Sequence, residues 1–251
     1  MPARIHPANS EAGVLYVGTS GWNYPDWSGI FYPGELRAKD YLAYYSRHFA
    51  TTEVNYSFYH LPRPSTYSNW DAQVPAAFRF AVKASRTITH IRRLAGAEKE
   101  WAQFLGNART LGPKLGPVLL QLPPSFRKDI GLLRGFLAID AGAAAIAVEF
   151  RHSSWFDGET FAALRDAAAA LVIAHSARYP QAPLETTAPF VYLRFHGPGA
   201  LFASIYSEAQ LREWARAIRA WLTVGLDVYA YFNNDYRGYA LDNARQLLAI
   251  V

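Results

Sequence analysis

The sequence contains no cysteine, so disulfides, thiolate nucleophiles and cysteine-ligated zinc or iron–sulfur sites are excluded. It has no apolar run approaching the roughly 20 residues that a membrane-spanning helix needs. Residues 1–13 show no basic stretch followed by an apolar core, so we predict a flexible N-terminal segment there and no signal peptide. These absences favour a soluble cytoplasmic protein without a membrane partner.

Charge is sparse and unevenly placed. Hydrophobic residues make up 51% of the 251 residues, which is enough for a large core. Charged residues make up 18%, which is too few for a disordered chain. The formal net charge is +5, with 13 basic and 8 acidic residues in 1–125 and 12 of each in 126–251. The excess is compatible with a simple solubility effect. It also favours an anionic ligand, because guanidinium groups match carboxylate and phosphate oxygens.

Eight short β-rich runs alternate with helical patterns without a linker, which predicts a single α/β domain, a (β/α)8 TIM-type barrel over residues 14–251. The predicted strands are Leu15–Thr19, Thr51–Asn55, Arg79–Lys83, Val118–Gln121, Ala145–Glu149, Leu171–Ala174, Val191–Phe195 and Val228–Phe232. The predicted helices are Asp40–Phe49, Pro64–Asp71, Ala97–Leu111, Asp129–Ile139, Asp157–Leu171, Ser207–Leu222 and Tyr239–Val251. The sixth crossover, Arg178–Pro189, contains three prolines and is predicted to be irregular.

A doubly wound open sheet is the alternative fold. That fold requires a glycine-rich phosphate-binding turn directly after the first strand, followed at once by a helix. Glycines are present at Gly18 and Gly21, but a long aromatic loop from Trp22 to Pro33 follows them. The sequence therefore favours the closed barrel.

Nearly every predicted strand ends in a polar or ionisable residue. Several of these residues come in pairs two apart, so strand alternation turns both members to the same face. In a barrel that face is the lumen, and the sites of this fold lie at the carboxyl ends of the strands. The residues are Thr19, Glu53, Asn55, Lys83, Gln121, Glu149, Arg151, His175, Arg194, His196, Asn233 and Asp235.

Carboxylates and cations within this set predict acid–base chemistry on an anion. We expect Glu53, Glu149 and Lys83 to be catalytic, because two carboxylates in unequal environments can divide acid and base roles. Arg151 and Arg194 are expected to hold the anionic group. The alternative is a network of ion pairs that only neutralises its own buried charges. Clustering at one rim favours a site, and hence an enzyme that is a hydrolase, lyase or isomerase.

Aromatic residues near the same rim suggest what the substrate contains. Trp22 and Tyr56 would stack on a sugar ring or a nucleobase, unless they only pack on their neighbours. A phosphorylated or acidic sugar is therefore the expected substrate, with free phosphate as a related ligand. The other expected substrate-binding residues are Asn55, Gln121, His196, Asn233 and Asp235.

Two other classes of function remain open from the sequence. Arg86–Arg93 is the densest basic stretch, and with the aromatic loops it resembles a nucleic-acid footprint or a nuclease-like barrel. A basic stretch that is only exposed to solvent would have the same sequence pattern. A non-catalytic module that senses a metabolite is the third possibility.

No cofactor is expected, and a divalent metal is a minor alternative. His152, His175 and His196, with acidic partners, offer possible ligands. However, the chain has no His-x-x-x-His or other tight spacing, and the nearby cations would repel a metal ion. The GxSxG motif of a serine nucleophile is also absent.

Seven ordered segments cover nearly the whole chain: GTSGWNYPDWSGIFYP (18–33), TTEVNYSFYHLP (51–62), FRFAVKASRTITH (78–90), LGPKLGPVLLQLPPSF (111–126), AVEFRHSSWF (147–156), VYLRFHGP (191–198) and VYAYFNND (228–235). On these segments the sequence resembles the family called domain of unknown function 72. The resemblance implies a TIM-type barrel and brings no established reaction. It places Gly21, Trp22, Glu53, Asn55, Lys83, Gln121, Glu149, Arg151, Arg194, His196, Asn233 and Asn234 in the family's motifs. The family leads us to expect an acidic residue after the sixth strand, where this chain has His175.

Overall fold

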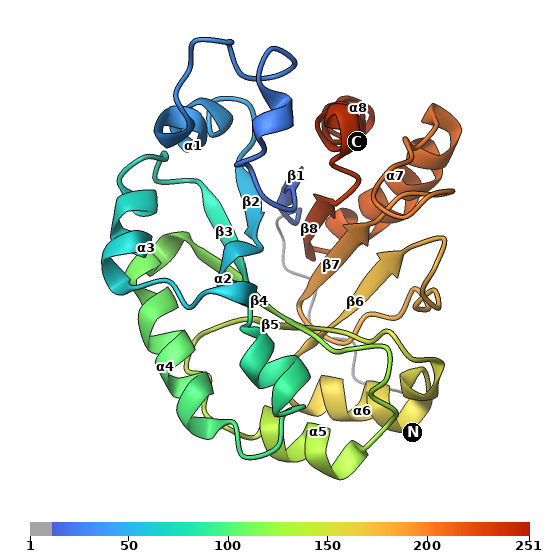
Figure 1. The fold of residues 1–251 in the computed structure, drawn as a ribbon. Helices are drawn as coiled ribbons and strands as arrows, with labels where there is room; N and C mark the ends of the chain where they lie inside the picture. The colour runs from blue at the N-terminus through green and yellow to red at the C-terminus, as the bar shows by residue number, and fades with distance from the viewer. Residues whose placement is uncertain (1–11) are drawn as a thin grey trace.

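The computed structural model describes residues 12–251 and shows eight parallel strands arranged around one axis, with helices outside them (Figure 1). The strands are β1 (Leu15–Thr19), β2 (Thr51–Val54), β3 (Arg79–Lys83), β4 (Leu115–Gln121), β5 (Ile146–Glu149), β6 (Ala170–His175), β7 (Phe190–Phe195) and β8 (Asp227–Phe232). Their hydrogen-bonded order is β1-β8-β7-β6-β5-β4-β3-β2. The predicted TIM-type barrel is confirmed.

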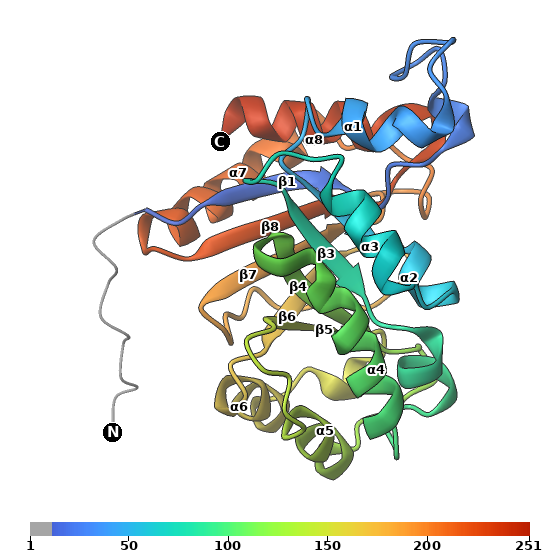
Figure 2. The ribbon, with the colours of Figure 1, turned by 90° about the vertical axis from the view of Figure 1, so that its left-hand side faces the viewer.

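The helices form the outer layer of the barrel, and Figure 2 shows α7 beside α8 and α5 beside α6. They are α1 (Tyr41–Tyr45), α2 (Tyr56–Tyr59), α3 (Pro64–Asp71), α4 (Glu98–Ala108), α5 (Ile130–Leu137), α6 (Gly158–Asp166), α7 (Glu208–Thr223) and α8 (Tyr239–Ile250). Helix α7 begins at a capping box in which Ser207 and Gln210 satisfy each other's backbone N–H groups. Within residues 12–251, no helix is long and apolar enough to cross a membrane.

Alternate residues of each strand fill the lumen. Small side chains on three strands, such as Ala81, Ala147 and Ala170, leave room for Tyr192 and Tyr231, and all of these residues belong to one buried cluster. Two residues beyond Ala81, Ala147 and Tyr192 lies a polar layer of the lumen. Its members are Glu53, Lys83, Gln121, Glu149 and Arg194, all buried. Because side chains of a strand alternate between its two faces, the expected residues lie in the lumen at the carboxyl-terminal mouth.

The barrel is nearly closed rather than fully closed, because no backbone ladder joins β1 to β2 within the described chain. The hydroxyl of Tyr45 bridges the gap: it accepts from Thr19 N at 2.9 Å and donates to Thr51 O at 3.1 Å. Thr52 Oγ1 also donates to Thr19 O at 3.1 Å. The seam between β1 and β2 is thus held by side chains. The pattern of apolar runs in the sequence does not predict these contacts.

The seam requires glycine at position 18, which gives a testable prediction. A Cβ on Gly18 would lie 2.1 Å from Thr51 O. We expect Gly18→Ala to destabilise the protein by about 3 kcal/mol, since the backbone cannot move without opening the seam. The matched control is Gly106→Ala in α4, where a Cβ meets nothing within 4 Å. It should stabilise by up to about 1 kcal/mol. Urea unfolding of both variants measures this; similar stabilities would contradict the argument.

Several helix bounds differ from the prediction. The expected helix at Asp40–Phe49 is only Tyr41–Tyr45, and a short helix, α2, follows β2 where no helix was predicted. The basic stretch Arg86–Arg93 contains a π-helical turn, Thr87–Ile91. As predicted, the sixth crossover contains no helix. Most of the predicted N-terminal segment, 1–13, lies outside the described residues, and the backbone N–H of Gly13 donates to Leu222 O at 2.8 Å.

Candidate functional site

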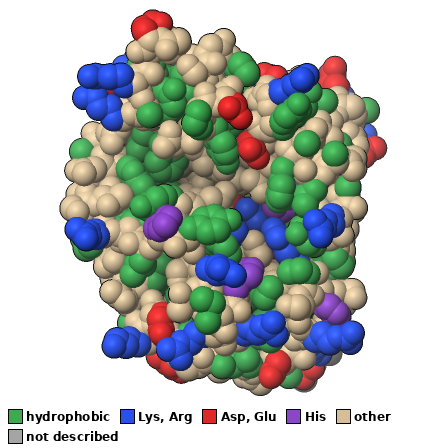
Figure 3. Space-filling model, in the orientation of Figure 1, with side chains coloured by type: hydrophobic (Ala, Val, Ile, Leu, Met, Phe, Trp, Pro, Cys, Tyr) green, Lys and Arg blue, Asp and Glu red, His purple; other side chains and the backbone are tan. Residues whose placement is uncertain are grey.

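A cavity of about 440 Å³ opens at the carboxyl ends of the strands. The face shown in Figure 3 is hollowed near its centre, with basic side chains at the edge of the hollow. The lining residues are Tyr24, Asn55, Phe58, Tyr59, Lys83, His90, Gln121, Arg151, Tyr179, Arg194, Phe202, Asn233 and Asp235. Seven of the expected site residues, from β2 through the loop after β8, therefore surround one space.

Glu53 lies at the floor of this site and is fully buried. Its carboxylate accepts hydrogen bonds from Ser20 Oγ at 2.8 Å and Tyr192 Oη at 2.7 Å. Arg194 Nη2 donates a third at 2.7 Å. Three donors, two from β7 and one directly after β1, thus hold one carboxylate, which removes most of the penalty of burying its charge.

Arg194 also links the floor to Glu149. Its Nη1 donates to Glu149 Oε2 at 2.5 Å, while Arg151 Nε donates to Glu149 Oε1 at 2.8 Å. The Arg151 guanidinium stacks on the ring of Tyr179 with 4.2 Å from its carbon to the ring centroid. Each buried carboxylate therefore has at least one guanidinium partner, as a buried ion-pair network requires.

Both carboxylates are ionised. Burial pushes the pKa of Glu53 upward, but Arg194 and the hydrogen bonds from Arg194 and Tyr192 hold it below its ordinary value of 4.5. Burial acts in the same direction on Glu149, but Arg151 and Arg194 hold its pKa well below 4.5. A carboxylate that stays ionised is a poor proton donor at neutral pH. The acid–base roles expected of the two glutamates remain predictions, and the geometry favours an anchoring role.

Lys83 differs from the arginines around it. Its side chain is 9% exposed, and its Nζ lies 4.1 Å from the centroid of the Phe58 ring. No carboxylate of the described residues lies within ion-pair distance of it. Burial, reinforced by the Arg194 guanidinium, lowers the pKa of Lys83 from 10.5 to about 7. Lys83 is therefore the cation in the cavity that exchanges a proton near neutral pH.

A second cavity of about 570 Å³ adjoins the first and shares Tyr24 and Asn55 with it. The expected stacking residues Trp22 and Tyr56 line this second cavity rather than the first, together with Trp70. Amide side chains contribute much of the remaining wall: Asn23, Asn55, Asn69 and Gln73. The Oδ1 of Asn55 is buried without a hydrogen-bond partner among the described residues. Asn55 therefore places a buried acceptor, without a partner in the described part of the chain, next to the junction of the two cavities.

His196 lies behind the site and is fully buried. Its Nε2 is 3.6 Å from Glu149 Oε1, and its Nδ1 is 3.1 Å from Asn233 Nδ2. Burial lowers the pKa of His196 to about 4, so the ring is neutral at pH 7. His196 is not among the residues that line the cavity. It supports Glu149 and Asn233, and its expected contact with substrate remains a prediction.

Sequence reasoning missed Tyr192 and Ser20, which hold Glu53, as well as Tyr179, which stacks on Arg151. A signal for Tyr192 was present, because it stands two residues before Arg194 and so shares its lumen face. No signal could identify Tyr179, since it comes from the irregular sixth crossover.

The basic stretch Arg86–Arg93 lies beside the mouth, but part of its charge is already neutralised. The guanidinium of Arg92 donates to Glu100 Oε1 from Nε at 3.0 Å and from Nη2 at 2.7 Å. Arg93 Nη2 donates to Ser125 Oγ at 3.2 Å. Binding of nucleic acid by this stretch remains a prediction.

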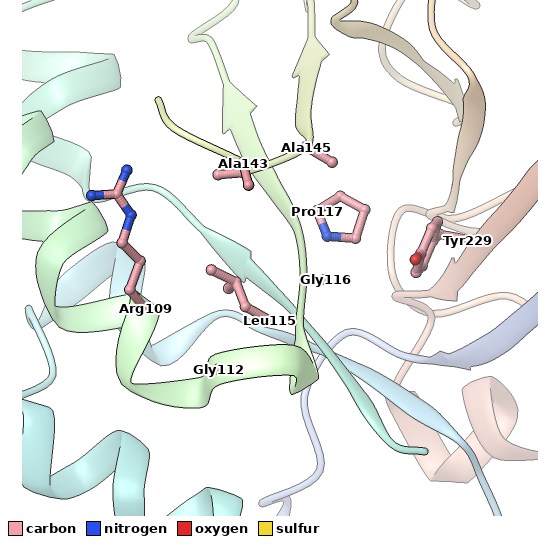
Figure 4. Close-up of a pocket in the computed structure, with 9 residues that line it drawn as sticks. Arg109, Gly112, Leu115, Gly116, Pro117, Ala143, Ala145 and Tyr229 are labelled. Atoms are coloured by element: carbon pink, nitrogen blue, oxygen red, sulfur yellow. The ribbon is translucent and has the colours of Figure 1, made fainter. Parts of the chain in front are cut away.

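A cavity of about 370 Å³ lies at the opposite end of the barrel, where β4, β5 and β8 begin. In Figure 4, Arg109 and Tyr229 stand on opposite sides of it, with Pro117 and alanines between them. Arg109 Nη2 donates to Ala141 O at 3.1 Å. Its lining contains no carboxylate or lysine, so this end of the barrel offers little for catalysis.

No group of three or more histidine, aspartate or glutamate side chains in residues 12–251 is arranged to hold a metal ion. Around the two glutamates the charged neighbours are Arg151, Arg194 and Lys83, and the neutral ring of His196 lies beside Glu149. The metal and cofactor expectations remain predictions.

A family model described as "Protein of unknown function DUF72" matches residues 16–251. The chain belongs to the DUF72 family. It is 26% identical to UPF0759 protein YunF of Bacillus subtilis over 95% of both chains. It is 31% identical to UPF0759 protein YecE of Escherichia coli over 57% of this chain and 50% of that protein. Neither name states an activity.

Solved DUF72 structures share the fold. The crystal structure of a DUF72 family protein from Thermotoga maritima matches with a TM-score of 0.84 and 29% identity, covering 94% of this chain and 98% of that one. One from Enterococcus faecalis matches with a TM-score of 0.80 and 21% identity, covering 94% and 95%. The comparisons establish the family and the barrel, and no substrate.

His175, where the chain departs from the expected DUF72 pattern, lies outside the lumen. Alternation places Ala174 in the lumen cluster and turns His175 outward. Its Nδ1 is 2.8 Å from Tyr206 Oη, and its ring lies against Trp214 of α7 with 5.9 Å between centroids. In this DUF72 chain the position contributes to packing between β6 and α7.

Proposed function

We propose that this DUF72 protein is an enzyme that acts on a small, polar, anionic substrate at the carboxyl-terminal mouth of the barrel. The observation that carries the proposal is Lys83: a buried lysine without a carboxylate partner, whose pKa of about 7 lets it give or take a proton at neutral pH. Glu53 and Glu149 keep Arg194 and Arg151 in place around it. Perturbed lysines of this kind are concentrated at active sites.

The charges of the cavity support an anionic substrate. Arg151, Arg194 and protonated Lys83 lie beside Glu53 and Glu149, so this buried cluster has one positive charge in excess, while Asp235 adds a carboxylate on the cavity wall. Arg151 uses only Nε on Glu149, and the described structure gives its two terminal nitrogens no partner. These donors point to binding of a carboxylate or a phosphate.

The second cavity supports a substrate with a ring attached to the anionic group. Aromatic faces of Trp22, Tyr56 and Trp70 combined with side-chain amides suit the apolar faces and hydroxyl groups of a sugar. The two cavities share Tyr24 and Asn55 in their walls, which supports a substrate that reaches from one to the other. A phosphorylated or acidic sugar has both an anionic group for the first cavity and a ring for the second.

The test is a panel of sugar phosphates, sugar acids and their neutral parents, followed by proton and phosphorus NMR. We expect at least one anionic member to bind and change chemically, with its neutral parent unaffected. Lys83→Met should slow turnover by about 10²–10⁴-fold, as expected for loss of a general acid or base. Lys99→Met, at an exposed lysine of α4, is the control and should behave as wild type. Absence of binding across the panel would remove the proposal, and binding without conversion would favour a metabolite sensor.

A further inference from the structure

We propose that Lys83 is a nucleophile that forms an imine with the carbonyl group of an anionic aldehyde or ketone. This inference rests on the proposed function, because it assumes that the anion enters the same cavity. It goes further in assigning the lysine a covalent role and in naming a carbonyl as the reacting group of the substrate.

The position of Lys83 suits a nucleophile better than an anion anchor. The carboxylates of Glu53 and Glu149 are occupied by guanidinium groups, and the lysine amine is left facing the ring of Phe58 and the cavity. A permanent anion anchor is better served by arginine, which stays charged and binds in a fork. Unlike an arginine, a lysine has a lone pair available once its proton has left.

The charges around Lys83 come from four elements. Arg194 of β7 and Arg151 after β5 disfavour its protonated form, whereas Glu149 of β5 and Glu53 of β2 favour it. His90 and Asp235 also line the cavity. Desolvation beside another cation is a known way of activating a lysine amine. At pH 7 about half of such an amine is neutral, against fewer than about one in a thousand for a solvated lysine.

The reaction balances without an oxidant or a metal. The lone pair of Nζ attacks the carbonyl carbon, a C–N bond forms, and the carbonyl electrons move to oxygen, which takes a proton. Loss of that oxygen as water forms the C=N bond, so a protonated lysine and a carbonyl give a protonated imine and water. The titratable side chains available to carry these protons in the cavity are Asp235 and His90. The positive imine would then withdraw electrons from an adjacent C–H or C–C bond.

The experiment traps the imine with cyanoborohydride at pH 7, using pyruvate and dihydroxyacetone phosphate as anionic probes and acetone as a neutral probe. Peptide mass spectrometry locates the adduct among the five lysines, Lys39, Lys83, Lys99, Lys114 and Lys128. We expect an anionic probe to label Lys83 at least about tenfold more than Lys99, and more than acetone does, in line with its larger neutral fraction. Excess inorganic phosphate should compete with the labelling.

Lys83→Arg separates the two proposals, since it keeps a cation in the cavity but cannot form an imine. It should retain binding of the anionic probe in a thermal-shift assay and lose labelling. Labelling of wild-type Lys83 no greater than that of Lys99 overturns the imine, even if the probes bind. Wild-type protein that neither binds nor is labelled would overturn the anion site as well.

Discussion

Replacement of Arg194 by methionine is expected to destabilise the protein by about 3–5 kcal/mol, because it leaves two buried carboxylates without their shared partner. Arg194 is 1% exposed and donates to Glu53 at 2.7 Å and to Glu149 at 2.5 Å. Arg151 remains for Glu149, whereas Glu53 keeps only the hydroxyls of Ser20 and Tyr192. Chemical denaturation at pH 7 measures the loss.

The control is Arg134→Met, which removes an ion pair of similar length, 3.0 Å to Asp166, whose side chains are 46% and 67% exposed. Its effect should be under about 1 kcal/mol, because exposed pairs contribute little. Adding Glu53→Gln and Glu149→Gln to the Arg194 variant should recover part of the stability by removing the unpaired charges. Equal effects of Arg194→Met and Arg134→Met would show that the network is not buried as described.

Replacement of Lys83 by methionine is expected to stabilise the protein at pH 7 while it slows turnover by about 10²–10⁴-fold. The pKa of Lys83 falls from 10.5 in the unfolded chain to about 7 in the fold. Between these values the unfolded chain binds more protons, so the penalty of burying Lys83 is complete below pH 7 and disappears as the pH rises towards 10.5. At roughly 1.4 kcal/mol per pKa unit, the variant should gain about 2–4 kcal/mol at neutral pH.

Thermal and urea unfolding of wild type, Lys83→Met and Lys99→Met between pH 6 and 10 test this. The difference between the Lys83 variant and wild type should shrink as the pH rises, whereas Lys99→Met should follow wild type throughout, because Lys99 is exposed. A Lys83 variant less stable than wild type at pH 7 would mean that the lysine serves the fold, and its place in the proposed chemistry would be withdrawn.

The fold could be predicted because its signal is local. Apolar runs such as Val191–Phe195, each followed by a helical pattern, indicate parallel strands before any contact is known. The bounds of the first helix were wrong, and a tertiary contact at its end could not be predicted. The helix expected at Asp40–Phe49 ends early, and Tyr45 at its end uses its hydroxyl to bridge β1 and β2. No sequence pattern within residues 40–49 predicts that the Tyr45 hydroxyl contacts β1 and β2.

The site was only partly predictable, for a related reason. Alternation along one strand shows that Glu53 or Lys83 faces the lumen, but it does not show which charges meet. Arg194 pairs with Glu53 across 141 residues of chain and with Glu149 across 45. Those pairs occupy the two glutamates and leave Lys83 without a carboxylate partner among the described residues, so the pKa that moves towards neutrality is that of the lysine, whereas the pKa of each glutamate stays below its ordinary value.

The amino-acid sequence by itself determined the barrel and the face to which each polar strand end turns, since both depend on residues close together in the chain. It also determined the excess of positive charge, which depends only on composition. Only the tertiary structure decided that Arg194 neutralises two glutamates, that the Tyr45 hydroxyl joins β1 to β2, and that Lys83 is left as an unpaired amine in a cavity. The physical reason is that an ionisable group's charge depends on burial and on its neighbours in space.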